Sequence, residues 1–213
     1  MPPSNTSSHD LKAIHAQTRD IYDRAARGYD AHRTKVLFER DWLDRFLSCL
    51  PQTPRVLDVG CGAGEPIARY LLDQRCVLTG VDVAPGMLSL ARERFPDHHW
   101  LEADMRSLDL DGTFDGVLSW NASFHLTAQE QRDTIPLLAN HVAPAGTLMF
   151  TIGPSEGEAT GTVEGHPVYH ASLDPGEYRS ILSNLGFSGI ELGLEDPKCN
   201  LHSIVLATNK KPS

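Results

Sequence analysis

The sequence predicts an α/β fold in which helices cover both faces of a mostly parallel sheet of seven strands. Two observations support this prediction. Short apolar runs of strand length alternate with longer segments in which apolar residues recur every three or four positions. A glycine-rich turn at 60–64 directly follows the first apolar run and leads into a helical segment. Because such alternation produces a doubly wound sheet, we expect a ligand beyond the carboxyl ends of the strands.

The elements follow in a simple order along the chain. Helical periodicity covers 11–29 and 36–50 before the first strand begins. The expected strands are 55–59, 77–81, 99–101, 114–119, 147–152, 189–194 and 201–207. The expected helices among them are 65–72, 85–95, 128–141 and 175–185. Pro85 and Pro175 stand in first helical turns, where proline is tolerated.

Composition limits the possible partners. The 213 residues include 40% hydrophobic and 22% charged residues, which suits one domain with a sizeable core. A net charge of −9 argues against a nucleic-acid or anionic-membrane partner, because cations must neutralise phosphates. The four cysteines form no C-x-x-C pair, and no apolar run reaches the roughly 18 residues of a membrane helix. We therefore expect a cytoplasmic protein whose residues 1–10, which lack signal-peptide features, form a disordered tail.

Residues 153–174 form the longest stretch between an expected strand and an expected helix. The stretch is rich in glycine and small polar residues, and we expect it to be a lid or binding loop. His166, Tyr169 and His170 lie within it and suggest either an acceptor pocket or a metal site. No acid beyond Glu164 stands at ligand spacing, so we expect no metal.

The glycine turn indicates the kind of ligand. Its spacing is G-x-G-x-G rather than the G-x-G-x-x-G of dinucleotide enzymes, and Asp58 and Glu65 flank it, where they would repel a pyrophosphate. Asp82 ends the next strand 18 residues after Gly64, the usual place for an acid that accepts hydrogen bonds from ribose. These features predict a nucleoside that carries positive charge.

Six segments resemble, in the right order, those of class I S-adenosylmethionine-dependent methyltransferases of the small-molecule type. They cover about 130 residues and are VLDVGCGAG (56–64), TGVDVAPGML (79–88), LEADMRSL (101–108), FDGVLSWNASFHL (114–126), HVAPAGTLMF (141–150) and EYRSILSNLGF (177–187). YDRAARGYDA (22–31) is similar to the helical lids of ubiquinone and menaquinone methyltransferases. The resemblance implies a Rossmann-like core at 51–208 and an N-terminal helical lid at 11–50.

The resemblance also implies how S-adenosylmethionine would bind. Gly60, Cys61 and Gly62 would line its methionine part and ribose, and Asp58 would face its ammonium, directly or through water. Asp82 would hold the ribose hydroxyls. The remaining implied contacts are Val83 and Met87 on the adenine faces, Ala103 nearby, Asp104 and the Met105 backbone at the adenine edge, and the Trp120 carbonyl at the ammonium. For Asp104, Met87 and Trp120, an ordinary loop or core role is the alternative.

The first helix suggests how the lid reaches the ligand. Tyr22 and Tyr29 are seven residues apart and so share one helical face, and Arg33 follows one turn later. In the families that this chain resembles, such a tyrosine and a basic residue reach the cofactor carboxylate. A structural aromatic stripe is the alternative interpretation.

The acceptor side of the site is less constrained. Methyl transfer requires alignment and exclusion of water, and a general base only if the acceptor arrives protonated. His125 is the candidate base, because an ordinary histidine pKa near 6.5 suits proton removal at neutral pH. Asn121, with Tyr169 and His170, could bind the acceptor, although capping of a local turn is the favoured role for Asn121. The region also departs from the D/N-P-P-Y/F signature of enzymes that methylate amino groups of nucleic acids.

We therefore predict an S-adenosylmethionine-dependent enzyme that methylates an oxygen, nitrogen or carbon atom of a small molecule. Three alternatives remain open: a nonenzymatic S-adenosylmethionine-binding regulatory protein, an NAD-dependent oxidoreductase, and a protein methyltransferase with an open groove.

Overall fold

The computed structural model describes residues 8–212 of the chain. A seven-stranded sheet runs through its centre in the order β3-β2-β1-β4-β5-β9-β8. The strands are β1 (Arg55–Val59), β2 (Val77–Asp82), β3 (His99–Glu102), β4 (Phe114–Ser119), β5 (Val142–Ile152), β8 (Phe187–Asp196) and β9 (His202–Lys210). The first five are parallel, whereas β9 runs antiparallel to both β5 and β8. The predicted fold class is therefore confirmed.

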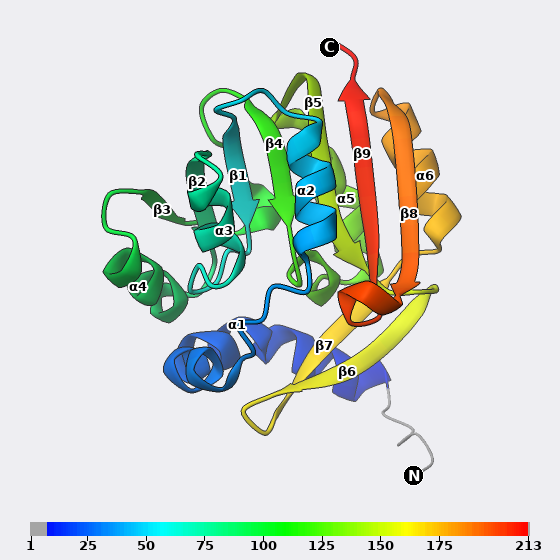
Figure 1. The fold of residues 1–213 in the computed structure, drawn as a ribbon. Coiled ribbons are helices and arrows are strands. Elements are labelled where there is room, and N and C mark those ends of the chain that lie inside the picture. The colour runs from blue at the N-terminus through cyan, green and yellow to red at the C-terminus, as the bar shows by residue number, and fades with distance from the viewer. Residues whose placement is uncertain (1–7, 213) are drawn as a thin grey trace.

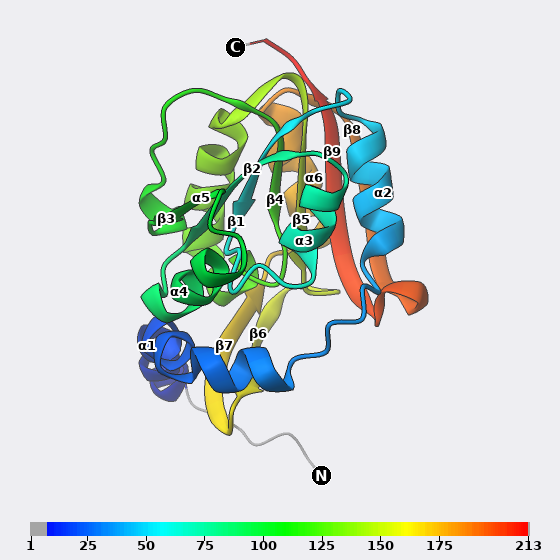
Figure 2. The same ribbon diagram turned by 60° about the vertical axis from the view of Figure 1, so that its left-hand side comes forward.

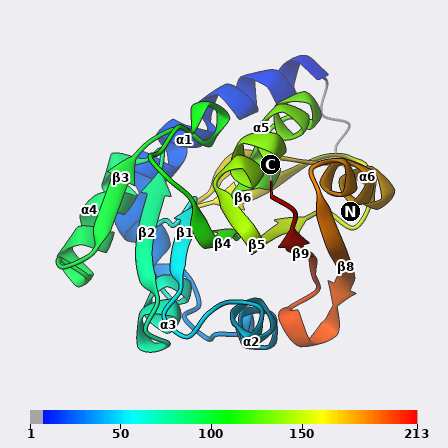
Figure 3. The same cartoon turned by 90° about the horizontal axis from the view of Figure 1, so that it is seen from above.

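Helices cover both faces of the sheet, as Figure 3 shows from above. Apolar side chains of α2 (Arg40–Ser48) and α3 (Ile67–Asp73) join one core cluster, with α4 (Pro85–Arg94) towards β3. Those of α5 (Ala128–Asn140) and α6 (Pro175–Asn184) join the cluster on the opposite face. Short turns of 3-10 helix lie at Met105–Ser107, Ser123–His125 and Pro197–Cys199. No helix among residues 8–212 is both long and apolar enough to cross a membrane.

The N-terminal region divides into two parts with different partners. Helix α1 (Ser8–His32) lies across the end of the sheet where β1 and β2 finish (Figures 1 and 2). Helix α2 instead packs on the sheet, where Trp42, Leu43 and Phe46 are almost completely buried. Within the predicted lid at 11–50, α2 therefore belongs to the core, and only α1 lies over the end of the sheet. Of the predicted tail, Ser8–Asp10 begin α1, and residues 1–7 lie outside the described part of the chain.

The predicted loop at 153–174 is wrong, because most of it forms an antiparallel hairpin. Strand β6 (Gly157–Val163) pairs with β7 (His166–Ser172) along their full length. Glu164 and Gly165 form the two-residue connection, with φ angles of 49° and 81°. Two successive positive φ values are typical of the type I′ turn, whose twist matches that of the paired strands. The pattern V-E-G-H was the signal for this turn in the sequence.

Helix α1 and the hairpin together form a second layer over the end of the sheet (Figure 1). Ile21 of α1 packs with Val163 and Val168 of the hairpin, and Ala26 packs with Met87 of α4. Ion pairs add to this apolar contact: Arg94 binds Asp30, and Arg19 lies 3.2 Å from Glu102. The space between this layer and the sheet is where a ligand can be enclosed.

Candidate active site

The larger cavity, which we call the first cavity, lies between α1 and the carboxyl ends of β1, β2 and β4, with a volume of about 540 Å³. This is the position expected for a ligand of a doubly wound sheet. Fourteen of the residues predicted for the site line it: Tyr22, Tyr29, Arg33, Gly60, Gly62, Asp82, Val83, Met87, Ala103, Asp104, Met105, Trp120, Asn121 and His125.

The glycine turn forms the floor of the first cavity. The backbone N–H groups of Gly60 and Cys61 both donate to the carbonyl of Val81, at 2.7 and 3.0 Å, which fixes the turn against β2. Gly60 has a φ of +80°, and a Cβ there would collide with Ala122. Gly62 has a φ of +54°, and a Cβ there would meet nothing within 4 Å. Gly60 is therefore required by packing, whereas Gly62 leaves its backbone open to a ligand.

Two buried carboxylates stand at the ends of β1 and β2. Asp82 accepts hydrogen bonds from the N–H groups of Gly62 at 2.8 Å and Ala84 at 2.9 Å, and burial raises its pKa in spite of these bonds. Burial, with a contribution from Asp82, raises the pKa of Asp58 to about 7, and Arg33 opposes the shift. Two acids with raised pKa values beside one cavity are suited to a cationic ligand.

Asp58 and Cys61 do not line the first cavity. Asp58 is 3% exposed and lies behind the cavity wall, so it would act on a ligand through the field or a water molecule. The Cys61 side chain points into the apolar core, close to Gly80 and in the same cluster as Trp100, and its buried thiol has a raised pKa. The prediction that Cys61 contacts the ligand is therefore wrong for its side chain, because that side chain packs in the apolar core.

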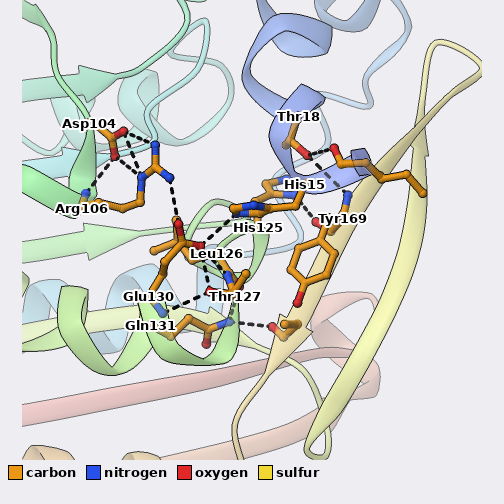
Figure 4. A network of polar contacts seen from close by, with 12 residues as sticks. His15, Thr18, Asp104, Arg106, His125, Leu126, Thr127, Glu130, Gln131 and Tyr169 are labelled. Atoms are coloured by element: carbon orange, nitrogen blue, oxygen red, sulfur yellow. Dashed lines mark hydrogen bonds and ion pairs between the residues drawn. The ribbon is translucent and has the colours of Figure 1, made fainter. Parts of the chain in front are cut away.

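The opposite end of the first cavity is bounded by a charged network (Figure 4). The Asp104 carboxylate accepts from the backbone N–H of Arg106 at 2.9 Å and from its guanidinium at 2.6 and 3.0 Å. These hydrogen bonds hold the pKa of Asp104 below its usual range. Arg106 also reaches Glu130, which lies 2.9 Å from His15 of α1. The network ties α1 to α5. His15 and Arg106 were missed from the sequence because Glu130, which joins them, is distant from both along the chain.

Tyr22 and Tyr29 line the cavity from α1, and Arg33 lines it from the position directly after the helix. The two tyrosine rings meet edge to face at 5.4 Å, and the Arg33 guanidinium lies 5.9 Å from the centre of the Tyr29 ring. Arg33 is thus the cation that faces the ends of β1 and β2, where it acts on the buried Asp58.

His125 is held by hydrogen bonds at both ring nitrogens. Nδ1 lies 2.8 Å from the carbonyl oxygen of Tyr169, which can only accept, so Nδ1 carries the hydrogen. Nε2 therefore accepts from the hydroxyl of Tyr22 at 3.0 Å. Burial, helped by His170 and His15, lowers the pKa of His125 to about 4. The argument for His125 as a base rested on an ordinary pKa and is wrong on that point, since the site keeps this ring neutral and weakly basic.

A second cavity of about 330 Å³ adjoins the first. Tyr22, Tyr29 and Asn121 line both cavities, so the two meet at these residues. The hairpin and the segment 200–203, which ends in the first two residues of β9, complete the second cavity, and His170 and His202 are among its walls. His202 was missed from the sequence, because nothing in its local pattern distinguishes it from an ordinary residue at the start of a strand.

Tyr169 does not reach either cavity with its side chain. Tyr169 is 1% exposed, its hydroxyl donates to Glu158, and its ring meets the His15 ring in a T-shaped contact at 5.2 Å (Figure 4). Residues 169 and 170 are neighbours in a strand and so point to opposite faces of the hairpin. The prediction of Tyr169 as a side chain for the acceptor is therefore wrong, although its carbonyl orients His125.

Asn121 adopts a φ of +52° directly after β4, and its N–H donates to Thr151 Oγ1 at 2.8 Å. Its buried side-chain oxygen has no hydrogen-bond partner within residues 8–212. The capping role favoured from the sequence is wrong, because a cap would have given this oxygen a backbone donor. Across the part of the chain that the structure describes, no three His, Cys, Asp or Glu side chains form a group that could hold a metal ion.

Comparison with known proteins agrees with this geometry. Residues 56–146 match the family model described as "Methyltransferase domain". A malonyl-[acyl-carrier protein] O-methyltransferase of Enterobacter lignolyticus (strain SCF1) is 32% identical over 61% of this chain and 51% of its own length. A dTDP-3-amino-3,6-dideoxy-alpha-D-glucopyranose N,N-dimethyltransferase of Streptomyces fradiae is 34% identical, with the same two coverages. The chain thus spans about half the length of these curated relatives.

The fold is also shared with solved structures. An SAM-bound amino pentose methyltransferase from Micromonospora echinaspora, CalS10, superposes with a TM-score of 0.67 at 24% identity. The superposition covers 89% of this chain and 96% of that protein. The predicted resemblance to the class I methyltransferase fold is confirmed by this similarity together with the family match.

Proposed function

We propose that this chain, whose residues 56–146 match a methyltransferase domain, transfers a methyl group from S-adenosylmethionine to a small-molecule acceptor. The observation that carries the proposal is the pair of adjoining cavities at the carboxyl ends of the strands. One has the charges and the open glycine turn of a cationic-nucleoside site, and the other leaves room for a second reactant.

The residues of the first cavity suit S-adenosylmethionine in one orientation, with its carboxylate at Arg33 and its adenine at Asp104. Asp82, which accepts a hydrogen bond from the Gly62 amide, would also accept hydrogen bonds from the ribose hydroxyls, and Gly62 has no Cβ to obstruct the ligand. Arg33 would be the cation for the carboxylate end of the ligand. Asp104 and the Met105 backbone would bind the polar edge of the adenine, and the apolar Val83, Met87 and Ala103 would pack against its faces.

The buried acids suit the positive end of the same ligand. Asp58 lies next to Asp82, and both carboxyl groups are buried. The ionised form of each is therefore unfavourable unless a cation lies nearby. The ammonium of the ligand would supply that cation, and the carbonyl of Trp120 would accept a hydrogen bond from it. When bound, S-adenosylmethionine supplies an activated methyl group on a sulfonium, which needs alignment and a dry environment rather than covalent help from the protein.

Tyr22 and His125 position groups at the junction of the two cavities. The Tyr22 hydroxyl donates its hydrogen to neutral His125, so its oxygen lone pairs can accept a hydrogen bond from the methyl acceptor. Burial raises the pKa of Tyr22, so the hydroxyl remains protonated at neutral pH. His125 thus orients Tyr22, while Asn121 and His170 meet the acceptor itself.

The relative that acts on an amino sugar and the charge of this chain support a small acceptor. By their names, the relatives act on a malonyl-[acyl-carrier protein] and on a dTDP-linked amino sugar, so the acceptor varies among similar proteins. The net charge of −9 opposes a nucleic-acid acceptor. The four unpaired cysteines fit the reducing cytoplasm, where we place the protein.

Calorimetric titration of the protein with S-adenosylmethionine, S-adenosylhomocysteine and NAD in one buffer tests the proposal. Micromolar binding of both sulfur nucleosides without heat from NAD is the expected result. Binding of NAD alone would replace the methyltransferase by an oxidoreductase. If both sulfur nucleosides bind but labelled methyl groups reach no compound of a broad acceptor panel, the nonenzymatic cofactor-binding alternative is favoured.

A further inference from the structure

The second cavity differs from the first in having no charged walls. None of the described side chains that line it is Lys, Arg, Asp or Glu. The first cavity, by contrast, is lined by Arg19, Asp20, Arg33, Asp82, Asp104 and Arg106. An ion bound against these walls would lose part of its hydration without gaining a counter-ion, which disfavours binding. An uncharged occupant is therefore favoured over a carboxylate, a phosphate ester or an ammonium.

Flat rings form much of the wall. Phe124 meets the ring of His170 at 4.7 Å, and His170 lies over Gly161, where a Cβ would collide with it. His202 is stacked on Trp120 at 5.7 Å, and its Nδ1 lies 2.9 Å from the Cys199 carbonyl, which orients the ring. Fixed rings beside a cavity of about 330 Å³ suit a planar molecule of one or two rings.

One polar atom is placed to recognise the occupant. The side-chain oxygen of Asn121 is buried and lacks a partner within residues 8–212, and Asn121 lines both cavities. A buried oxygen without a hydrogen bond costs about 1–3 kcal/mol, so a site that keeps one is suited to a donor from outside the chain. The positive φ of Asn121 aims the residue there at a cost in backbone strain.

We propose that the second cavity binds an uncharged, planar methyl acceptor that donates an N–H or O–H group to Asn121 Oδ1. In the transfer, the bond between the sulfonium and the methyl carbon would break as the acceptor atom bonds to that carbon. S-adenosylhomocysteine would leave, and the acceptor's proton would be released to water. The inference rests on the proposed function and deepens it by naming the class of acceptor. It assigns the specificity of the reaction to Asn121 and to the rings of the second cavity.

A matched series of naphthalene probes tests this class directly. The four probes carry a hydroxyl, methoxy, carboxylate or aminomethyl group at the same ring position and are titrated into the protein saturated with S-adenosylhomocysteine. Naphthol should bind about 3- to 10-fold tighter than methoxynaphthalene, the value of one neutral hydrogen bond. It should bind at least about tenfold tighter than naphthoate or naphthylmethylammonium, because these remain ionised.

Three variants locate the binding. Asn121→Gly, which suits the positive φ, should remove the preference for naphthol over methoxynaphthalene. Thr162→Trp fills the second cavity and should abolish naphthol binding, whereas Thr160→Trp, exposed on the same strand and outside both cavities, should not. S-adenosylhomocysteine should bind all three variants within about threefold of the parent protein, a change of less than 1 kcal/mol.

The outcomes separate this inference from the proposed function. If S-adenosylhomocysteine binds but an ionised probe binds tightest, the acceptor class is wrong and the proposed function stands. The same holds if Asn121→Gly weakens S-adenosylhomocysteine while the preference for naphthol persists, because the oxygen then serves the cofactor. Failure of S-adenosylhomocysteine to bind the parent protein would overturn both.

Discussion

The two cavities meet at Tyr22, Tyr29 and Asn121 but are built in different ways. The first is formed largely by turns that follow consecutive strands and is rich in charged side chains. The second is formed by a hairpin, the turn after β4 and the start of β9, and no described side chain on its walls carries a full charge. The difference is consistent with the proposal that the first cavity binds S-adenosylmethionine and the second binds the methyl acceptor.

Substitution of Asp82 should affect the first cavity most. Asp82→Ala removes the carboxylate that braces Gly62 and is proposed to hold the ribose, so affinity for S-adenosylhomocysteine should fall by about 100-fold or more. Calorimetry measures this, with exposed Asp97→Ala as the control. Naphthol binding without cofactor should change less than about threefold, under 1 kcal/mol. An equal loss in both cavities would mean that Asp82 supports the fold rather than one ligand.

Glycine substitutions sharpen the same contrast. Gly62→Ala and Gly112→Ala both place a side chain at positive φ, and neither Cβ meets a protein atom within 4 Å. Each should destabilise the fold by a similar amount, about 1 kcal/mol. Only Gly62 lines the first cavity, so only Gly62→Ala should weaken S-adenosylhomocysteine binding, by about tenfold or more, as a methyl group in contact with the ligand would. Equal affinities in the two variants would place the nucleoside elsewhere.

Binding of S-adenosylhomocysteine should depend on pH through Asp58. Its pKa is about 7 in the free protein, and a bound ammonium favours the ionised form, so affinity should rise as pH increases from 5 to 7 and then level off. The rise should be about tenfold, which is one pKa unit of coupling. Asp58→Asn should flatten the profile, which calorimetry in buffers of different ionisation enthalpy measures. A profile that is unchanged in the variant would assign the pH dependence to Asp82, whose pKa is also raised.

The same shift predicts the opposite slope for the stability of the free protein. Because the pKa of Asp58 is higher in the folded than in the unfolded chain, its contribution to the free energy of unfolding decreases as pH rises from about 4 to about 7. Urea denaturation at several pH values compares the parent protein with Asp58→Asn, in which this decrease should be absent. If the free energy of unfolding of the parent protein, relative to that of Asp58→Asn, instead increased between about pH 4 and pH 7, the raised pKa of Asp58 would be contradicted.

The smallest effect on cofactor binding is expected at the junction. Tyr22→Phe leaves Nε2 of buried His125 without its donor, which should lower the free energy of unfolding by about 1–2 kcal/mol. Tyr29→Phe is the matched control, since its hydroxyl makes no hydrogen bond to another residue among 8–212, and should cost less than about 0.5 kcal/mol. Affinity for S-adenosylhomocysteine should change less than about threefold in either. A larger loss in Tyr29→Phe would reverse the roles of the two rings.

The sequence predicted the first cavity far better than the second, and the reason is physical. Gly62, Asp82 and Asp104 follow strand ends within short local patterns, so parallel pairing alone brings them together. His202 and His170 line one cavity with Asn121 only because the hairpin folds over the sheet, a tertiary arrangement that no local pattern encodes. The pKa of His125 was also beyond the sequence, because burial and not residue type sets it.

The central claim is that the two cavities hold the two reactants of one methyl transfer. A crystal structure of the protein with S-adenosylhomocysteine and naphthol tests this most directly. We predict the carboxylate of the nucleoside near Arg33, its adenine near Asp104, and its sulfur facing the naphthol oxygen across Asn121, with room for a methyl group between them. A reversed nucleoside, or a sulfur that faces away from the second cavity, would contradict the account.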